Sequence, residues 1–310
     1  MSAARRVTES RAGRYRHRAG HSLERVGVRQ PSAGWDFAGP VAVMPGVSMI
    51  GYRDMGDALI DLQVAATTAV AILIEFGGRD LIVDDAHGRQ VLGSFVVGLR
   101  MAAARVRGRG PACVEVRLSP ARVNALFGVA PKALGGGIVA AEDLWGARVR
   151  RLREELAQAE NWEQRFSLAN SFLAQQYKPR HTPDPEVNAA WLHLLACGGQ
   201  VRVDALAETV GWSRKRLWAR FETQIGLTPK RAAMLVRFRC AVEGLVAGLP
   251  AAEVAAICGY TDQAHLCRDV AIFADRTPGA LQPDKLPALA LDRHRAWGTF
   301  FQASTRSTGR

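Results

Sequence analysis

The sequence predicts an α+β protein in which an N-terminal antiparallel β barrel or sandwich with flanking helices precedes an all-α C-terminal domain. Two observations carry this prediction. From about residue 41 to residue 118, apolar and polar side chains alternate with the period of two that is typical of strands. After Ser119-Pro120 the apolar residues recur at the spacing of helices instead. At 310 residues, the chain is long enough for two domains that each bury a core.

The strand region consists of short apolar segments separated by Gly and Asp turns. ALIDLQV places Ile60, Leu62 and Val64 on one face, and CVEVRL, residues 113–118, alternates in the same way. Several short strands at this spacing favour an antiparallel barrel or sandwich, and a cupin-like barrel is one form of it. A cupin-type metal site needs several His or Glu ligands, whereas His87 is the only histidine between residues 22 and 180. We therefore expect no metal in this domain.

The helices of the first domain begin after Ser119, which precedes a proline at the first helical position. A short helix is predicted to end at Phe127, and residues 142–177 are predicted to form one or two long helices. Four residues of that region make one apolar stripe: Leu144, Val149, Leu152 and Leu156. Such a stripe is typical of a domain core, and it would also suit the seam of a dimer.

Two stretches after the proline-containing segment KPRHTPDP, residues 178–185, share one layout. They are VDALAETVGWSRKRLWARF, residues 203–221, and AEVAAICGYTDQAHLCRDVAIF, residues 252–273. Each has a short helix, then glycine and an aromatic residue (Gly211-Trp212 or Gly259-Tyr260), then a second helix. The glycine allows the positive φ of a sharp turn. This is the layout of a helix-turn-helix unit, whose second helix enters the major groove of DNA.

A helix predicted from Thr228-Pro229 to about Gly248 joins the two units. A helix of this length spans roughly 28 Å, and successive major grooves on one side of DNA lie ~34 Å apart. The helix could therefore hold two recognition helices in adjacent grooves. Its arginines, Arg231, Arg237 and Arg239, are placed to contact phosphates.

The residues from 187 to 283 resemble the DNA-binding domain of AraC/XylS-type transcription regulators. The markers are SRKRLWARFETQIGLTPKRAAMLVRFRCA, and GYTDQAHLCRD followed by Thr277-Pro278. The resemblance implies seven helices in two helix-turn-helix units, an N-terminal sensing or dimerising domain, and activation by contact with RNA polymerase. By position in the motif it implies these base-reading residues: Arg214, Lys215, Trp218, Ala219, Gln263, Ala264, Cys267 and Arg268. The predicted DNA-binding residues also include Ser213, which caps the first recognition helix, and Arg237 on the joining helix.

The second unit departs from the family where its second helix ends. Family members carry basic residues and then a glycine before Thr-Pro, whereas here residues 269–276 read DVAIFADR and Asp275 replaces the glycine. Asp tolerates positive φ better than most residues. We expect the first unit to be the stronger DNA anchor.

The predicted organisation is therefore a disordered basic tail over 1–35, a sensing or dimerisation domain over 36–178 and a linker over 179–186. The double helix-turn-helix domain follows over 187–283, and then a C-terminal tail over 284–310. Eight arginines lie in residues 1–30; this tail is interpreted as a solvated leader, with a DNA-contacting arm as the alternative. The five cysteines are scattered, which favours a reducing cytoplasm.

The predicted function is a sequence-specific DNA-binding transcription regulator, expected to be an activator, to form a homodimer, and to bind double-stranded DNA and RNA polymerase. A small-molecule effector in the first domain is one form of this hypothesis, and a first domain that only dimerises is the alternative. An enzyme with an appended DNA-binding domain is disfavoured, because GxSxG, HExxH and Walker motifs are absent. No cofactor, metal or membrane segment is predicted.

Overall fold

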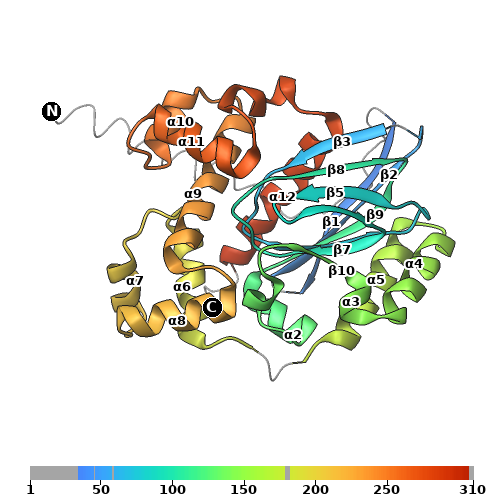
Figure 1. Cartoon of the computed structure of the whole chain (residues 1–310), viewed down its shortest axis with the longest axis horizontal. Coiled ribbons are helices and arrows are strands. Elements are labelled where there is room, and N and C mark those ends of the chain that lie inside the picture. Colours follow the sequence, from blue (N-terminus) through green and yellow to red (C-terminus); the bar gives the residue numbers. More distant parts are fainter. Residues whose placement is uncertain (1–33, 45, 58, 179–181, 307–310) are drawn as a thin grey trace.

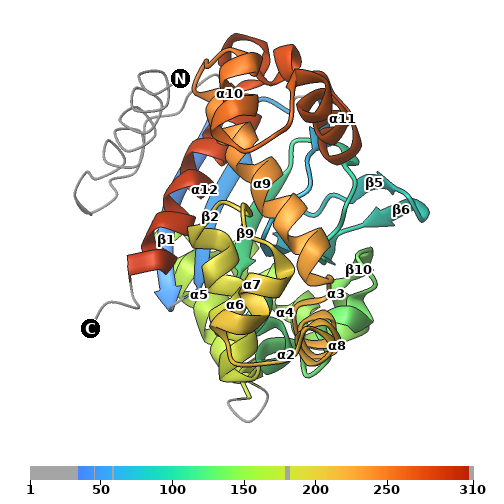
Figure 2. The ribbon, with the colours of Figure 1, turned by 90° about the vertical axis from the view of Figure 1, so that its left-hand side faces the viewer.

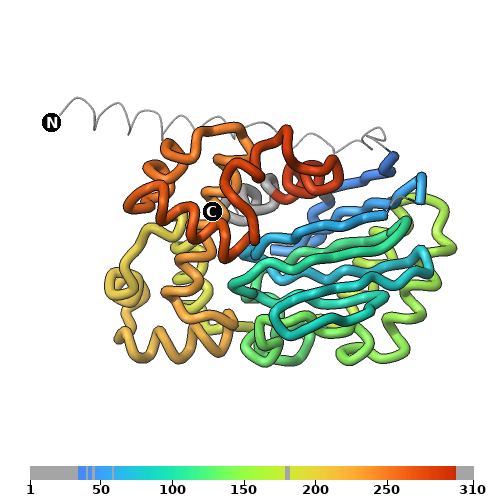
Figure 3. Tube along the Cα trace, turned by 45° about the horizontal axis from the view of Figure 1, so that its top comes forward, coloured from blue at the N-terminus to red at the C-terminus, as the bar shows by residue number. Residues whose placement is uncertain are grey.

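A computed structural model describes residues 34–44, 46–57, 59–178 and 182–306. Two β-sheets and their covering helices form one side of the molecule, and a helical domain lies beside one end of the sheets (Figures 1 and 3). The basic tail predicted over 1–35 lies outside the described residues up to residue 33, and Trp35 already begins the first strand.

The N-terminal domain is an antiparallel β-sandwich, which confirms the predicted fold class. The six-stranded sheet has the order β1 (Trp35–Met44), β2 (Val47–Asp54), β9 (Ala112–Leu118), β4 (Val70–Glu75), β7 (Ser94–Val97) and β10 (Ile138–Ala140). The four-stranded sheet has the order β3 (Leu59–Val64), β8 (Ala104–Arg109), β5 (Leu81–Asp85) and β6 (Gly88–Leu92). Strand β9 lies in the middle of the larger sheet, between β2 and β4.

Both faces of β9 are buried, so its alternating apolar and charged residues do not separate a core face from a solvent face. Val114, Val116 and Leu118 face a core formed with the helices. Glu115 and Arg117 are on the opposite face, toward the interior of the sandwich, and are only 1% and 9% exposed. These two charged residues therefore need partners inside the protein.

Short helices follow the strands and cover the outer face of the larger sheet. They are η1 (Pro120–Arg122), α2 (Val123–Phe127), η2 (Pro131–Leu134), α3 (Ala141–Trp145), α4 (Ala147–Gln158) and α5 (Trp162–Gln176). The region 142–177 thus holds three helices rather than one or two, because Gly146 at φ 58° ends α3. Asn161 caps α5, and its Oδ1 accepts the N–H of Gln164 at 2.9 Å.

The apolar stripe of α4 belongs to the core of its own domain. Val149, Leu152 and Leu156 are at most 2% exposed, and Leu144 packs against the same core. This stripe is therefore not available as a dimer seam.

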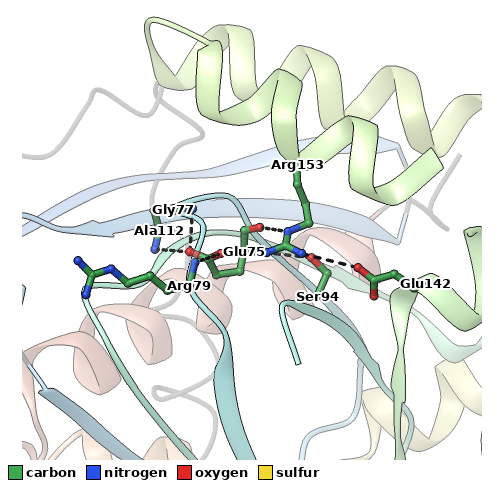
Figure 4. A network of polar contacts seen from close by, with 7 residues as sticks. All are labelled: Glu75, Gly77, Arg79, Ser94, Ala112, Glu142 and Arg153. Atoms are coloured by element: carbon green, nitrogen blue, oxygen red, sulfur yellow. Dashed lines mark hydrogen bonds and ion pairs between the residues drawn. The ribbon is translucent and has the colours of Figure 1, made fainter. Parts of the chain in front are cut away.

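A buried carboxylate connects α4 to the end of β4 (Figure 4). The side chain of Glu75 is fully buried and accepts the N–H groups of Gly77 at 2.7 Å and Arg79 at 3.1 Å. Arg153 of α4 donates its Nε to the Glu75 carbonyl oxygen at 2.7 Å and pairs with the Glu75 carboxylate at 3.4 Å. Burial raises the pKa of Glu75, and these donors oppose that shift. The contacts fix the helical layer on the sheet.

The C-terminal part is helical from Pro185 onward. Its helices are α6 (Pro185–Ala196), α7 (Val203–Thr209), α8 (Arg214–Ile225), α9 (Pro229–Val246), α10 (Ala251–Ile257), α11 (Gln263–Ala274), η4 (Pro278–Leu281), η5 (Pro283–Lys285) and α12 (Ala288–Arg306). Within the segment 284–310, which was expected to be a tail, residues 288–306 instead form α12. This helix lies along β1 and β2 of the first domain (Figure 2). None of the helices within the described residues is long and apolar enough to cross a membrane.

Candidate nucleic-acid interface

Two helix pairs in the C-terminal part repeat one geometry. Helices α7 and α8 form the first unit, helices α10 and α11 form the second, and α9 runs between them (Figure 2). In the first unit the Trp212 N–H donates to the Ala207 carbonyl at 3.0 Å, and in the second the Tyr260 N–H donates to the Ala255 carbonyl at 2.9 Å. The sequence repeat is therefore also a repeat of the backbone turn.

Each turn depends on its glycine, and each second helix begins at a cap. Gly211 has φ 68° and Gly259 has φ 71°, a region in which glycine is favoured. Ser213 accepts the N–H of Arg216 at 3.3 Å through its Oγ, and Asp262 accepts the N–H of His265 at 2.7 Å through its Oδ1. These bonds satisfy backbone donors that the start of a helix leaves unpaired.

The first turns of α8 present a basic, exposed surface. Arg214, Lys215 and Arg216 follow the cap and are all exposed, Trp218 is half-buried, and Ala219 is exposed. Leu217 and Phe221, on the other side of the helix, are fully buried. The helix thus anchors one face in the core and leaves Lys215 and Arg216 to solvent, while Arg214 pairs with Asp204 of α7 at 3.2 Å.

The first turns of α11 present a less charged surface. Gln263 and Ala264 are exposed, Cys267 is half-buried, and Arg268 is exposed with its Nε 3.4 Å from the Ala264 carbonyl. The N-terminal ends of both second helices therefore leave side chains accessible, at the positions the sequence predicts for base contacts.

Arg237 of α9 is placed differently from the expected phosphate contact. Its guanidinium lies 4.8 Å from the ring centroid of Tyr260, and its Nη2 is 3.9 Å from the Asp269 carboxylate. The side chain of Arg237 is 20% exposed and that of Asp269 is 5% exposed. Since its cation faces these two residues of the second unit, Arg237 connects α9 to α11 rather than extending toward solvent.

The other two arginines of α9 also differ from each other. Arg239 donates to Glu243 at 2.6 Å and has a side chain only 18% exposed. Arg231 is exposed near the start of α9. Of the three expected phosphate contacts, Arg231 is the one whose position suits that role.

Arg216 is a further cation of this surface that the sequence argument did not select. It is exposed on α8, and its guanidinium lies 4.3 Å from the centroid of the Trp212 ring. The aromatic ring attracts the cation and also favours one orientation of its side chain. The tripeptide RKR directly after the N-cap was the signal that could have identified it.

The end of α11 is bonded to the first domain. Asp275 ends the helix and adopts φ 51°. This is the left-handed conformation expected at a position where Asp takes the place of a glycine. The Asp275 Oδ2 accepts the Nε2 of Gln63 at 3.0 Å, and the Ala66 N–H donates to the Phe273 carbonyl at 2.8 Å. The second recognition helix is thus held by the end of β3 and by the loop that follows it.

Residues 206–283 match the protein family described as a helix-turn-helix domain. This part of the chain is an AraC-type helix-turn-helix domain. The AraC-type domain begins within α7 and ends just after η4, so it contains both units and α9. The sandwich and α12 lie outside the match.

Among solved structures, the chain is similar to ToxT from Vibrio cholerae, at 11% identity and a TM-score of 0.45, over 76% of this chain and 97% of that chain. It is also similar to the C-terminal domain of AraT, a response regulator from Geobacillus stearothermophilus, at 18% identity and a TM-score of 0.31, over 34% and 89%. The AraC-like transcriptional activator CuxR is similar at 14% identity and a TM-score of 0.27, over 61% and 80%. No curated protein matches the chain.

Proposed function

We propose that this protein regulates transcription by binding a specific duplex DNA sequence with the first turns of α8 and α11. The supporting observation is the repeated turn that leaves both of these helix starts exposed, on either side of α9. Helix α9 has 18 residues, a length of roughly 27 Å. That length suits two contacts in successive major grooves on one side of DNA, ~34 Å apart.

Footprinting of the full-length protein on genomic fragments tests this proposal. The expected footprint has two protected major-groove segments about one helical turn apart. Preference for single strands, or equal affinity for all duplexes at several salt concentrations, would contradict it.

We further propose that the first domain binds a small organic anion as effector. A cavity of about 70 Å³ opens inside the sandwich and is lined mainly by apolar side chains such as Ile60, Leu73 and Phe95. Arg100 at its wall is 7% exposed, and its Nη2 donates to the Val64 carbonyl at 3.1 Å. Its buried Nη1 has no hydrogen-bond partner among the described residues. Burial lowers the pKa of Arg100 to about 10, so it is still charged at neutral pH.

A charged guanidinium at the wall of an apolar cavity suits a carboxylate attached to a small apolar body. Thermal shift with short-chain and aromatic carboxylates, compared with their neutral amides, tests this. A rise in melting temperature for the acids alone, absent in Arg100→Met, is expected. Equal shifts with acids and amides would remove Arg100 from the site.

We also propose that the protein forms a homodimer and contacts RNA polymerase. In this proposal it activates rather than represses transcription, and it acts in the cytoplasm. Analytical ultracentrifugation of the full chain tests the dimer, whose contacts must lie elsewhere than the buried stripe of α4. Enzymatic activity is not part of the proposal. Among the described residues, no group of three or more His, Cys, Asp or Glu side chains is arranged to hold a metal ion.

A further inference from the structure

Helix α12 follows the DNA-binding domain in the chain but packs in the N-terminal sandwich. Its apolar anchors are Leu289, Ala296 and Trp297, which are 3%, 6% and 3% exposed. They share a core with residues of both sheets, among them Tyr52 of β2 and Ile60 of β3. The buried face of the helix therefore contributes to the core of the sandwich.

A charged side chain lies in the middle of this apolar contact. Arg293 donates its Nε to Glu115 of β9 at 2.8 Å, and its Nη2 pairs with the same oxygen at 2.7 Å. The other carboxylate oxygen of Glu115 accepts the Nε of Arg117 at 3.0 Å. The guanidinium of Arg117 in turn lies 4.5 Å from the ring centroid of Trp297.

This cluster depends on α12 for its charge balance. Burial alone would raise the pKa of Glu115, but Arg293 and Arg117 outweigh burial and hold that pKa below its usual value. Without α12, both Arg293 and the Trp297 ring would leave the buried pair of Glu115 and Arg117. Removing one partner of a buried ionic cluster is strongly destabilising, so the cluster holds α12 in place.

Two cavities meet at α12. Arg293 and Leu289 line the sandwich cavity that also contains Arg100. Arg293, His294 and Trp297 line a second cavity of about 150 Å³, between the sandwich and α9, together with Phe238 and Glu243. Arg293 is thus common to the cavity of the first domain and to the boundary between the two domains.

We propose that α12 is an intramolecular ligand of the sandwich, and that its docking competes with a small molecule bound in the sandwich cavity. Arg293 and Leu289 occupy one side of that cavity, so a ligand too large for the remaining space must displace α12. The turns η4 and η5 connect α11 to α12, and η4 packs on α9. Because these turns are the direct connection, displacement of α12 would change the position of the second DNA-binding unit. The inference rests on the proposed effector cavity, whereas its test does not require DNA.

The test uses the full-length protein and anilinonaphthalene sulfonate, an anionic dye with an apolar body larger than the cavity. Arg293→Met keeps the length of the side chain and removes its charge, and Arg293→Lys restores a cation. The matched control is Arg295→Met, because Arg295 is exposed on the same helix and its ion pair, with Asp292 at 3.6 Å, lies within that helix. Dye fluorescence gives the affinity, and hydrogen exchange gives the protection of residues 288–297 and of β9.

In Arg293→Met we expect dye affinity to rise about ten-fold and exchange in α12 to become about a hundred-fold faster, since a buried charged pair has lost one partner. Arg293→Lys should recover part of both effects, and Arg295→Met should behave as the wild type. In the wild type, dye should accelerate exchange in α12 while β9 stays protected.

Dye that binds the wild type without changing the protection of α12 would overturn the proposal, as would equal dye affinity in all four proteins. If β9 also loses protection in Arg293→Met, the substitution has disturbed the sandwich itself. The effect of the dye on hydrogen exchange in the wild-type protein then decides whether the proposal holds. Failure of the wild-type protein to bind any duplex would contradict the proposed function while leaving this result intact.

Discussion

At the scale of single residues, pairing within the protein determines which cations remain for DNA. Lys215 is exposed at the second position of α8, and Gln263 is exposed at the first position of α11. Both can reach base edges if these helices enter the major groove. Arg237 has the sign of charge that phosphate attracts, yet Tyr260 and Asp269 surround its guanidinium.

Replacing either base-facing residue should relax specificity. Lys215→Ala and Gln263→Ala are each expected to cost about 1–3 kcal/mol on the preferred site. The Lys215 change should cost more, since α8 starts with three consecutive cations and α11 does not. Titrations on specific and scrambled duplexes measure this. Equal losses on both duplexes for Lys215→Ala would exclude it from base reading.

Arg231 and Arg237 should behave differently although both lie on α9. Arg231→Ala should weaken binding to all duplexes and lower the salt slope by about one unit, as loss of a phosphate contact does. Arg237→Met should leave the slope unchanged and weaken contacts of α11 alone, because it disturbs how α11 sits on α9. Salt titrations with footprinting distinguish them. A reduced salt slope for Arg237→Met would restore its role as a phosphate contact.

His294 should make the docking of α12 sensitive to acid. Burial, with Arg117, Arg239 and Arg295 nearby, lowers its pKa to about 4. The unfolded histidine has a pKa near 6.5, so between about pH 6.5 and 4 the unfolded chain binds more protons. Stability present above pH 6.5 is therefore lost as the pH falls through this window, by about 3 kcal/mol in total.

Hydrogen exchange in α12 from pH 7.5 to 4.5, corrected for the intrinsic rate, measures this loss. His294→Gln should remove most of the pH dependence; the remainder is expected from Glu243, which lines the same cavity and whose pKa is raised by burial. An unchanged pH profile in His294→Gln would contradict the assignment.

At the scale of elements, the two turns should tolerate a side chain differently. Gly211→Ala meets nothing within 4 Å, so its cost is the positive φ alone, roughly 1–2 kcal/mol. Gly259→Ala has the same φ cost and also places Cβ 2.7 Å from Gln200 Oε1. Gln200 donates to the Ile257 carbonyl at 3.2 Å, so this bond should be lost as well.

Urea unfolding should therefore rank Gly259→Ala below Gly211→Ala in stability. Gly279→Ala is the matched control, because Gly279 has neither a positive φ nor a neighbour within 4 Å of the added carbon. A Gly211→Ala protein as stable as this control would show that the turn does not need glycine.

Sequence reasoning missed α12, and one residue explains why. The inward-facing residues of α12 have helical spacing: Leu289, Arg293, Ala296 and Trp297. Because one of them is an arginine, the sequence does not show a continuous apolar stripe. The partner of Arg293, Glu115, is 178 positions away in the chain. The double unit was predictable because turn glycines, caps and Thr-Pro pairs are local signals. The pairings of Arg237 and Arg293 were not, because they depend on which distant elements come together.

At the scale of the whole molecule, the two domains share one packed core. The main cluster of buried side chains runs from Met49 and Val116 in the sheet to Leu217 and Phe273 in the helical domain. Lys132 after α2 also pairs with Glu222 of α8 at 3.5 Å. The recognition helices are therefore not on a freely moving module in this conformation.

We accordingly expect unfolding of both domains in a single transition. Hydrogen exchange should show β9 and α9 losing protection at the same urea concentration, since contiguous cores open as cooperative units. Two separated transitions would show that the contacts between the domains contribute little stability.

The position of α12 also has a consequence for how the protein is made. The sandwich begins at residue 35, but its core lacks Leu289, Ala296 and Trp297 until the DNA-binding domain has already been synthesised. At ~5–20 residues per second, roughly 10 to 30 s separate the synthesis of β9 from that of α12. During that interval Glu115 has no Arg293 and the end of the sandwich is open. A ribosome-bound chain in this state is expected to need a chaperone or a bound ligand at that opening. The order of the domains in the chain therefore delays completion of the first domain until after the second has been synthesised.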